Sequence, residues 1–377
     1  MARAPALADT ENAPEADRLD GFPHPRHTRQ LFGHEQAEKI LAEGLVSGRM
    51  HHGWLITGTQ GIGKATLAYK FARAALSRPD DRARLGASLD TPPDKPASRQ
   101  VAALSHPGLL VLRRGYDQKA KRFPAAISVD EVRRLRSFLS LSAEEGGWRV
   151  VIVDSADEMN LNAANALLKS LEEPPAQTIF LILSCEPGRL LATIRSRCRK
   201  LSLDALSGQT MRMAVRQAYE AEQKSPPGDA DLAALAPLAG GSVRRTLLLA
   251  GSGGLQLQGR IEKIFGGLPV LDMQAAHQLA DELQPAAAEQ KFELFFELLF
   301  GYLGRLTRLA ATGAATADSD AATLIIARRV IGDARVASFA QLWETLARDK
   351  AEALALNLDR KALILDVLTR IEAAARA

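Results

Sequence analysis

Short apolar runs alternate with amphipathic stretches through the first half of the chain. The runs "GWLIT" (53–57), "WRVVIVD" (148–154) and "TIFLILSC" (178–185) are continuous and rich in β-branched residues, which predicts buried strands. Between the last two, and before them, "LNAANALLKSLEE" (161–173) and "SVDEVRRLRSFLSL" (128–141) place apolar side chains at helical spacing. Strands that alternate with helices predict an α/β module with a parallel sheet and helices on both of its faces.

Strand signals fade after residue 204, and helical periodicity dominates the remainder. The segment "LAALAPLAGGSVRRTLLLAG" (232–251) predicts two short helices joined at Gly240-Gly241, and longer helices with wide apolar faces follow. A chain of 377 residues is expected to form two or three domains. The predicted divisions are an α/β module over 26–204, a small helical domain over 205–254 and an all-α domain over 255–377.

Two segments lack any periodicity. Residues 1–25 are polar and rich in Pro and Ala, which predicts a disordered tail. The segment "SRPDDRARLGASLDTPPDKPASRQ" (77–100) is rich in Pro, Asp, Ser and Arg, which predicts a long mobile insertion. Folded structure is therefore expected to start after residue 25 and to be interrupted once within the α/β module.

Charge and cysteine content exclude several classes of protein. Lys and Arg number 48 against 44 Asp and Glu, so a net charge of +4 permits weak contact with nucleic acid without requiring it. Cys185 and Cys198 are too few for a disulfide framework or a four-thiolate zinc site. The N-terminus lacks a signal-like apolar core, and no run of about eighteen apolar residues occurs. We expect a cytoplasmic protein with no metal and no contact with a membrane.

The loop "GTQGIGKAT" (58–66) lies between a predicted strand and a predicted helix. Its spacing matches a phosphate-binding loop, in which backbone N–H groups, a helix N-terminus and a lysine contact phosphates. An ordinary Gly-rich strand-to-helix turn is the alternative. The matching residues are Gly58, Gly61, Gly63 and Lys64. Ala65 stands where a hydroxyl would bind Mg²⁺, and Thr66 is rotated from that position by about 100° on a helix. Metal-assisted phosphoryl transfer is therefore not expected here.

The acidic end of the second predicted strand shows another departure. Asp154 is followed by Ser155. In P-loop proteins of the additional-strand class that hydrolyse nucleotide, a Glu stands at this position and orients the attacking water. Asp157 and Glu158 lie beyond a turn and are interpreted as solvated charges at a helix start. Two independent defects thus indicate that this chain does not hydrolyse nucleotide by itself.

Three blocks together resemble the clamp-loader branch of the AAA+ superfamily over about residues 30–204. They are "HGWLITGTQGIGKATLAYKFARAAL", "RVVIVDSADEMNLNAANALLKSLEEPP" and "LILSCEPGRLLATIRSRCRKLSL". The stretch "NALLKSLEEPP" (165–175) is a hallmark of that branch. The alternative is a generic amphipathic helix, which would explain its leucines but not Asn165, Glu172 and the two prolines together. The tripeptide "SRC" (196–198), about a dozen residues after a buried strand, resembles the arginine-finger motif of the family.

The resemblance implies roles for individual residues. Arg197 would reach the γ-phosphate of ATP bound to a neighbouring subunit, with a surface arginine in a salt bridge as the alternative. Ser184 would be the sensor-1 residue and Arg244 the sensor-2 arginine, with Arg245 in that place if the alignment shifts; a plain helix-surface role is the alternative for each. The predicted nucleotide-binding residues are Gly58, Gly61, Gly63, Lys64, Ala65, Thr66, Asp154, Ser184 and Arg244.

The resemblance also implies an architecture and a function. The fold would be a P-loop AAA+ parallel-sheet module, a small helical lid (205–254) and an all-α collar (255–377) that joins other subunits. The chain would be a clamp-loader subunit of the bacterial DNA polymerase III holoenzyme, a nucleotidyltransferase, and would act in DNA replication as a largely non-hydrolysing stator. Partners would be ATPase subunits of the gamma or tau type, a delta-type subunit, and the sliding clamp and primed DNA through the hetero-oligomer.

Nucleotide and metal requirements follow from the same resemblance. Lys64 and the loop amides leave passive ATP binding open, while intrinsic ATPase activity is not expected. Related subunits have a four-cysteine zinc module after the phosphate-loop helix, but residues 77–100 contain no cysteine, so no zinc is expected. The alternative function is an autonomous AAA+ ATPase, or a gamma/tau-type clamp-loader ATPase, in DNA replication or repair.

Overall fold

The computed structural model describes residues 14–86, 88–140, 147–313, 321–356 and 358–377. The chain divides into two compact units, one formed by residues up to 226 together with 240–245, the other by 227–239 and 246–377. These limits differ from the predicted domain limits at 204 and 254, and the division into module, lid and collar stays a prediction.

A parallel five-stranded sheet forms the centre of the first unit in the described part of the chain, in the order β2-β3-β4-β1-β5. The strands are β1 (Gly53–Thr57), β2 (Leu109–Leu112), β3 (Arg149–Val153), β4 (Thr178–Ser184) and β5 (Arg199–Ser202). The three predicted strands are confirmed as β1, β3 and β4. Strand β5 was not predicted because it lies at the sheet edge, where only Leu201 among its residues is buried.

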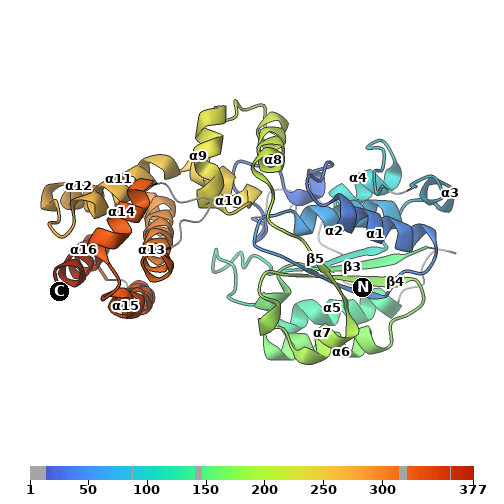
Figure 1. Ribbon diagram of the computed structural model, residues 1–377. Coiled ribbons are helices and arrows are strands. Elements are labelled where there is room, and N and C mark those ends of the chain that lie inside the picture. The colour runs from blue at the N-terminus through green and yellow to red at the C-terminus, as the bar shows by residue number, and fades with distance from the viewer. Residues whose placement is uncertain (1–13, 87, 141–146, 314–320, 357) are drawn as a thin grey trace. The chain divides into compact units, whose positions relative to one another are not determined.

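Helices cover both faces of this sheet (Figure 1). One face packs against α1 (Glu35–Val46), α2 (Lys64–Ala75) and α4 (Pro96–Ala102). The other packs against α5 (Val129–Ser140), α6 (Leu161–Glu172) and α7 (Ala192–Arg197). Strand residues alternate between the two cores, so that Ile56 faces α2 while Leu55 faces α6. The predicted α/β fold class is confirmed.

The predicted mobile insertion is instead anchored to the module. It forms the short helix α3 (Pro79–Arg82) and the start of α4, and Leu89 is completely buried. The backbone N–H of Leu89 donates to Glu38 Oε1 at 2.8 Å, and Lys70 Nζ lies 2.8 Å from the same oxygen. The prediction was wrong because it weighed the Pro and Asp content and missed the apolar side chains, above all Leu89, that dock the segment.

The predicted disordered tail needs a second correction. Residues 1–13 lie outside the described residues, but residues 14–25 pack against the module. Phe22 is buried and its ring lies 5.1 Å from that of Tyr219, in α8 (Gly208–Ala221). His24, just before the 3₁₀ helix η2 (Pro25–His27), is only 1% exposed. Two aromatic rings in a polar segment thus help to hold it against the module, a signal that composition alone does not show.

The second unit is all-helical in its described residues, as predicted. Its helices are α9 (Asp229–Ala239), α11 (Gly254–Gly267), α12 (Met273–Leu283), α13 (Glu289–Thr312), α14 (Ala321–Val330), α15 (Val336–Ala355) and α16 (Arg360–Arg376), while α10 (Val243–Gly251) belongs partly to each unit. Helix α13 is central, since it packs against α11, α14 and α15. In the described part of the chain, no helix combines the length and apolar character that crossing a membrane requires.

Candidate functional site

The carboxyl ends of the parallel strands bring most of the predicted nucleotide-binding residues to one edge of the sheet. The loop at Gly58 follows β1, Asp154 follows β3 and Ser184 ends β4. Arg113 follows β2 at the same edge and was not predicted. Ligands of open α/β sheets bind beyond the carboxyl ends of the strands, so this edge is the expected place for a nucleotide. A charged residue directly after an apolar run was the missed signal for Arg113.

The glycine loop is shaped to receive a second segment of the same unit. Gly61 has φ +78°, and a Cβ there would lie 2.3 Å from the Cβ of Arg244. Ser242 Oγ donates to the carbonyl of Gln60 at 2.7 Å, and the N–H of Arg244 donates to the carbonyl of Gly61 at 3.3 Å. Residues 240–245 therefore pack directly on the loop, which brings Arg244 to the site that the sequence assigned to it.

Lys64 is directed at its own loop. Its side chain donates from Nζ to the carbonyls of Gly58 at 2.7 Å and Thr59 at 2.8 Å, and Nζ lies 3.1 Å from Cys185 Sγ. The residue is 8% exposed. Its three ammonium protons thus have three neighbours within the protein, one of which, Cys185, was not predicted to be in this site.

Ser184 also points inward. It is completely buried, and its hydroxyl donates to Asp157 Oδ1 at 2.5 Å, while the N–H of Cys185 donates to Asp157 Oδ2 at 2.6 Å. The interpretation of Asp157 as a solvated charge was therefore wrong. Ser155 has φ +58°, and the turn it starts places the 3₁₀ helix η3 (Ala156–Glu158) against β4.

Glu158 in the same short helix is an ion-pair partner as well, which corrects its interpretation as a solvated charge. Its Oε2 lies 2.5 Å from Nε of Arg114, the residue that follows Arg113 after β2. Burial raises the pKa of the Glu158 carboxyl, and the charge of Arg114 opposes that rise. Asp157 thus links the segment after β3 to the end of β4, and Glu158 links it to the end of β2. These partners are far apart in the sequence, so the sequence does not predict them.

Asp154 is buried, and no ion pair with a cationic side chain is found for it in the described part of the chain. It is 8% exposed, and its Oδ2 has no hydrogen-bond partner among the described residues. Burial first, and then the negative charge and hydrogen bond of Asp17, raise the pKa of Asp154 to about 8. For Asp17, burial acts in the raising direction, but the hydrogen bond and charge of His24 and the charge of Arg113 lower its pKa. Burial and the nearby charge of Asp17 thus favour the neutral form of Asp154, while His24 and Arg113 favour the charged form of Asp17.

Arg197 lies at the opposite edge of the sheet, where the amino ends of the parallel strands lie. It ends α7 just before β5, and its carbonyl oxygen approaches the start of β1 at Gly53. Nη2 lies 2.7 Å from Oε1 of Glu172, the last residue of α6, and Nη1 donates to the carbonyl of Thr193 at 3.0 Å. The side chain is 34% exposed and that of Glu172 is 47% exposed. The structure thus does not bring Arg197 together with the other predicted site residues.

Cys198, the last residue of the "SRC" motif, packs in the core under α6 and α7. Burial raises the pKa of its thiol to about 11, so the thiol stays protonated at neutral pH. Its part in the motif is to pack the end of α7 against β1, which fixes the backbone that presents Arg197. The predicted absence of zinc is not tested by this arrangement and stays a prediction.

Known proteins resemble this chain over the same regions. A family model described as "DNA polymerase III, delta subunit" matches residues 33–207. DNA polymerase III subunit delta' of Pseudomonas aeruginosa is 34% identical over 254 residues, which cover 67% of this chain and 71% of the relative. The chain belongs to the delta' family of DNA polymerase III subunits. The resemblance to the clamp-loader branch inferred from the motifs is thereby confirmed.

Two further relatives show how far the delta' likeness extends. Subunit delta' of Escherichia coli is 38% identical over 163 residues, 43% of this chain and 45% of the relative. Subunit tau of Escherichia coli is 27% identical over 298 residues, 76% of this chain but only 44% of the relative. The chain therefore spans less than half the length of that tau subunit, while it covers most of the Pseudomonas delta' subunit.

Proposed function

We propose that this delta' family chain is a clamp-loader subunit that assists ATP hydrolysis on a neighbouring subunit and hydrolyses little or no ATP itself. The position of Arg197 is the observation that carries the proposal. Strand β1 has five residues, with Gly53 near Arg197 at one end and the glycine loop at the other. At about 3.3 Å per residue the strand separates them by about 13 Å, so the guanidinium serves a site outside its own loop.

The anchoring of Arg197 suits such a role. A guanidinium keeps its charge at every relevant pH, so its position alone regulates its effect. Arg197 is paired with a carboxylate that is itself half exposed, and exposed ion pairs contribute only about 0–1 kcal/mol. A γ-phosphate of a neighbouring subunit offers a stronger, bidentate partner, so the side chain exchanges partners at little cost.

The chain's own loop supports the non-hydrolysing part of the proposal. Ala65 offers no hydroxyl for Mg²⁺, and Ser155 stands where a water-orienting Glu is expected. Asp154, the predicted strand-end acid, is buried next to a second acid, and the hydroxyl of Ser184 is bound to Asp157. These features support a loop that does not position Mg²⁺ or an attacking water.

Partners follow from the family. We infer that the chain assembles in the cytoplasm with gamma/tau-type ATPase subunits and a delta-type subunit, through the helices of its second unit. In that complex it would take part in loading the sliding clamp on primed DNA. Its relatives are subunits of DNA polymerase III, which supports an assembly of this kind.

The decisive experiment reconstitutes the complex with Arg197→Ala and measures DNA-stimulated ATPase activity. We expect assembly to persist on gel filtration and the turnover of the adjacent ATPase site to fall at least about tenfold, since arginine fingers in GTPases contribute about 10³–10⁵. Arg195→Ala is the matched control, because Arg195 is an exposed arginine in the same helix.

Two results would contradict the proposal. One is normal ATPase activity in the Arg197→Ala complex. The other is DNA-stimulated turnover by the purified chain alone that disappears in Lys64→Ala, which would instead support an autonomous AAA+ ATPase.

A further inference from the structure

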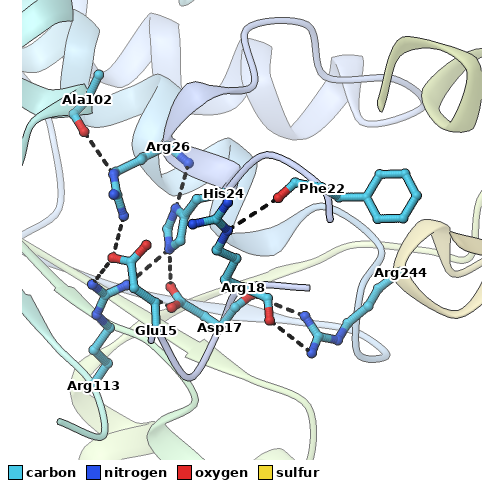
Figure 2. Close-up of polar contacts among 9 residues, drawn as sticks. All are labelled: Glu15, Asp17, Arg18, Phe22, His24, Arg26, Ala102, Arg113 and Arg244. Carbon is cyan, nitrogen blue, oxygen red and sulfur yellow. Dashed lines mark hydrogen bonds and ion pairs between the residues drawn. The ribbon is translucent and has the colours of Figure 1, made fainter. Parts of the chain in front are cut away.

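The end of strand β2 binds two acids from the N-terminal segment of the same unit (Figure 2). Arg113 Nη1 donates to Asp17 Oδ1 at 2.7 Å, and Arg113 Nη2 also pairs with Glu15. Arg26 Nη1 lies 2.5 Å from Glu15 Oε1. The side chains of Glu15 and Asp17 are only 10% and 11% exposed. These are buried ion pairs, in contrast to an ordinary contact of a tail with the surface.

The imidazole of His24 links Asp17 to the backbone of Arg26. Its Nδ1 accepts from the N–H of Arg26 at 3.0 Å, which leaves Nε2 to donate to Asp17 Oδ2 at 2.7 Å. Arg26 Nε donates in turn to the carbonyl of Ala102, at the end of α4, at 2.8 Å. Both carboxylate oxygens of Asp17 therefore have a partner, and the chain of contacts continues into the helices that cover the sheet.

Backbone carbonyls of the segment accept hydrogen bonds from Arg244, the predicted sensor-2 arginine. Arg244 donates from Nη1 to the carbonyl of Asp17 at 3.1 Å and from Nη2 to that of Arg18 at 3.5 Å, as Figure 2 shows. Asp17 also lies close enough to Asp154, the acid at the end of β3, for its charge to raise the pKa of Asp154. Residues 15–18 thus contact the end of β2 and the segment that packs on the glycine loop, and they lie near the end of β3.

This arrangement does not fit a bound nucleotide. Phosphates need cations and N–H donors that are free to face them, yet Lys64 is bonded to loop carbonyls and Arg244 to carbonyls of the segment. Asp17 and Glu15 add negative charge at the edge where the phosphates would lie. A phosphate brought to about 4 Å from a carboxylate would be repelled by about 4 kcal/mol at an effective dielectric constant of about 20.

We propose that the Glu15–Arg18 segment is an internal ligand of the phosphate-binding loop region and competes with ATP for it. The acids hold Arg113, and the backbone holds Arg244, so that the loop is closed in the free subunit. ATP binds only when the segment leaves. The competition concerns this chain's own loop and is independent of Arg197, which lies at the opposite edge.

The anchor that follows the segment determines how it can be removed. Phe22 packs on Tyr219, and Lys224 lies 5.0 Å from the centre of the Phe22 ring and donates to the carbonyl of Gly21. His24 is buried behind it. Residues 19–27 therefore stay in place by contacts of their own, and only residues up to 18 need to move.

Binding of a fluorescent, mant-labelled ATP analogue to the purified chain, with Mg²⁺, tests the competition. In Glu15→Gln with Asp17→Asn both charges are lost while side-chain size is kept, and we expect the affinity to rise at least tenfold. Asp20→Asn removes an exposed acid that lies just beyond the segment, in the anchor that stays in place, and serves as the matched control, with an expected change below twofold.

A second variant lacks residues 1–18 and keeps the Phe22 and His24 anchor. It should bind the analogue at least as tightly as the double variant, and adding Lys64→Ala to it should abolish the gain, which would place the binding at the loop. A cooperative thermal transition shows that each variant is folded. Folded variants that bind the analogue no better than the natural chain would overturn the proposal.

Discussion

The two edges of the central sheet treat their arginines in opposite ways. At the carboxyl edge, Arg113 and Arg244 are bound by carboxylates and carbonyls of the same unit and are largely withdrawn from solvent. At the amino edge, Arg197 has one exposed carboxylate and the carbonyl of its own helix as partners. The carboxyl edge is therefore called the saturated edge, because its arginines are bound by groups of the same unit. The amino edge is called the open edge, because Arg197 is partly exposed there and can contact another subunit.

This difference indicates which part of the α/β module keeps a function after the loop has lost groups needed for hydrolysis. Buried charge pairs at the carboxyl edge are costly to break, because removing one partner leaves an unpaired charge and costs about 3–5 kcal/mol. The exposed pair at the amino edge contributes about 1 kcal/mol at most. A subunit that serves its neighbour needs a rigid body and one movable arginine, and the two edges supply these separately.

The strongest disturbance of the saturated edge is expected from Gly61→Ala. A Cβ at this position would lie 2.3 Å from the Cβ of Arg244 and 2.6 Å from Ser242 Oγ, and φ is +78°. Overpacking and backbone strain together should lower the free energy of unfolding by about 2–4 kcal/mol. Chemical denaturation measures this loss. Gly188→Ala is the control, since no atom lies within 4 Å of a Cβ there, and a loss as large in Gly188→Ala would show that the contact with residues 240–245 is not the cause.

The sequence predicts the saturated edge only in part, for a physical reason. Continuous apolar runs define β1 from 53 to 57, and the glycine spacing locates the loop, because both signals are local. The partners of Arg113 are not local, since Asp17 lies 96 positions away in a segment whose composition predicts disorder. The amino edge is predicted better, because the "SRC" motif and the end of "NALLKSLEE" supply both members of the Arg197 pair.

A smaller effect tests the buried proton of the saturated edge. Burial and the charge of Asp17 raise the pKa of Asp154 to about 8. The ordinary pKa of an Asp carboxyl is about 3.9, so the folded state holds a proton that the unfolded state loses above about pH 4. The stability associated with this proton is complete below about pH 4 and is lost as pH rises through 8. Asp154→Asn has no such loss, so its stability relative to the natural chain should increase between pH 5 and 8 by at least about 1 kcal/mol, since one pKa unit is worth about 1.4 kcal/mol.

Thermal melting at several pH values measures this difference. Asp130→Asn removes a carboxylate whose side chain is 79% exposed and should give a profile parallel to that of the natural chain. A parallel profile for Asp154→Asn would mean that Asp154 is ionised in the folded state, and that the carboxyl edge holds no proton.

The smallest expected effect concerns the open edge and the carboxylate that holds Arg197. Glu172→Gln replaces the partner of Nη2 at 2.7 Å by a neutral group. Because the pair is exposed, stability should change by less than about 1 kcal/mol. If Glu172 positions the guanidinium for a neighbouring site, DNA-stimulated ATPase activity of the reconstituted complex should fall severalfold, through turnover more than through the Michaelis constant for ATP. Glu172→Asp, which restores the charge, should recover part of the activity.

Glu173→Gln is the matched control, since it removes an adjacent exposed carboxylate just beyond the end of α6. Equal activity of the Glu172→Gln and Glu173→Gln complexes would show that Arg197 finds its position without help from α6. The two edges would then differ even more than the contacts suggest, because the open edge would present an arginine held by hydrogen bonds within its own helix, to the carbonyl of Thr193 at 3.0 Å and to Ser196 Oγ at 3.5 Å.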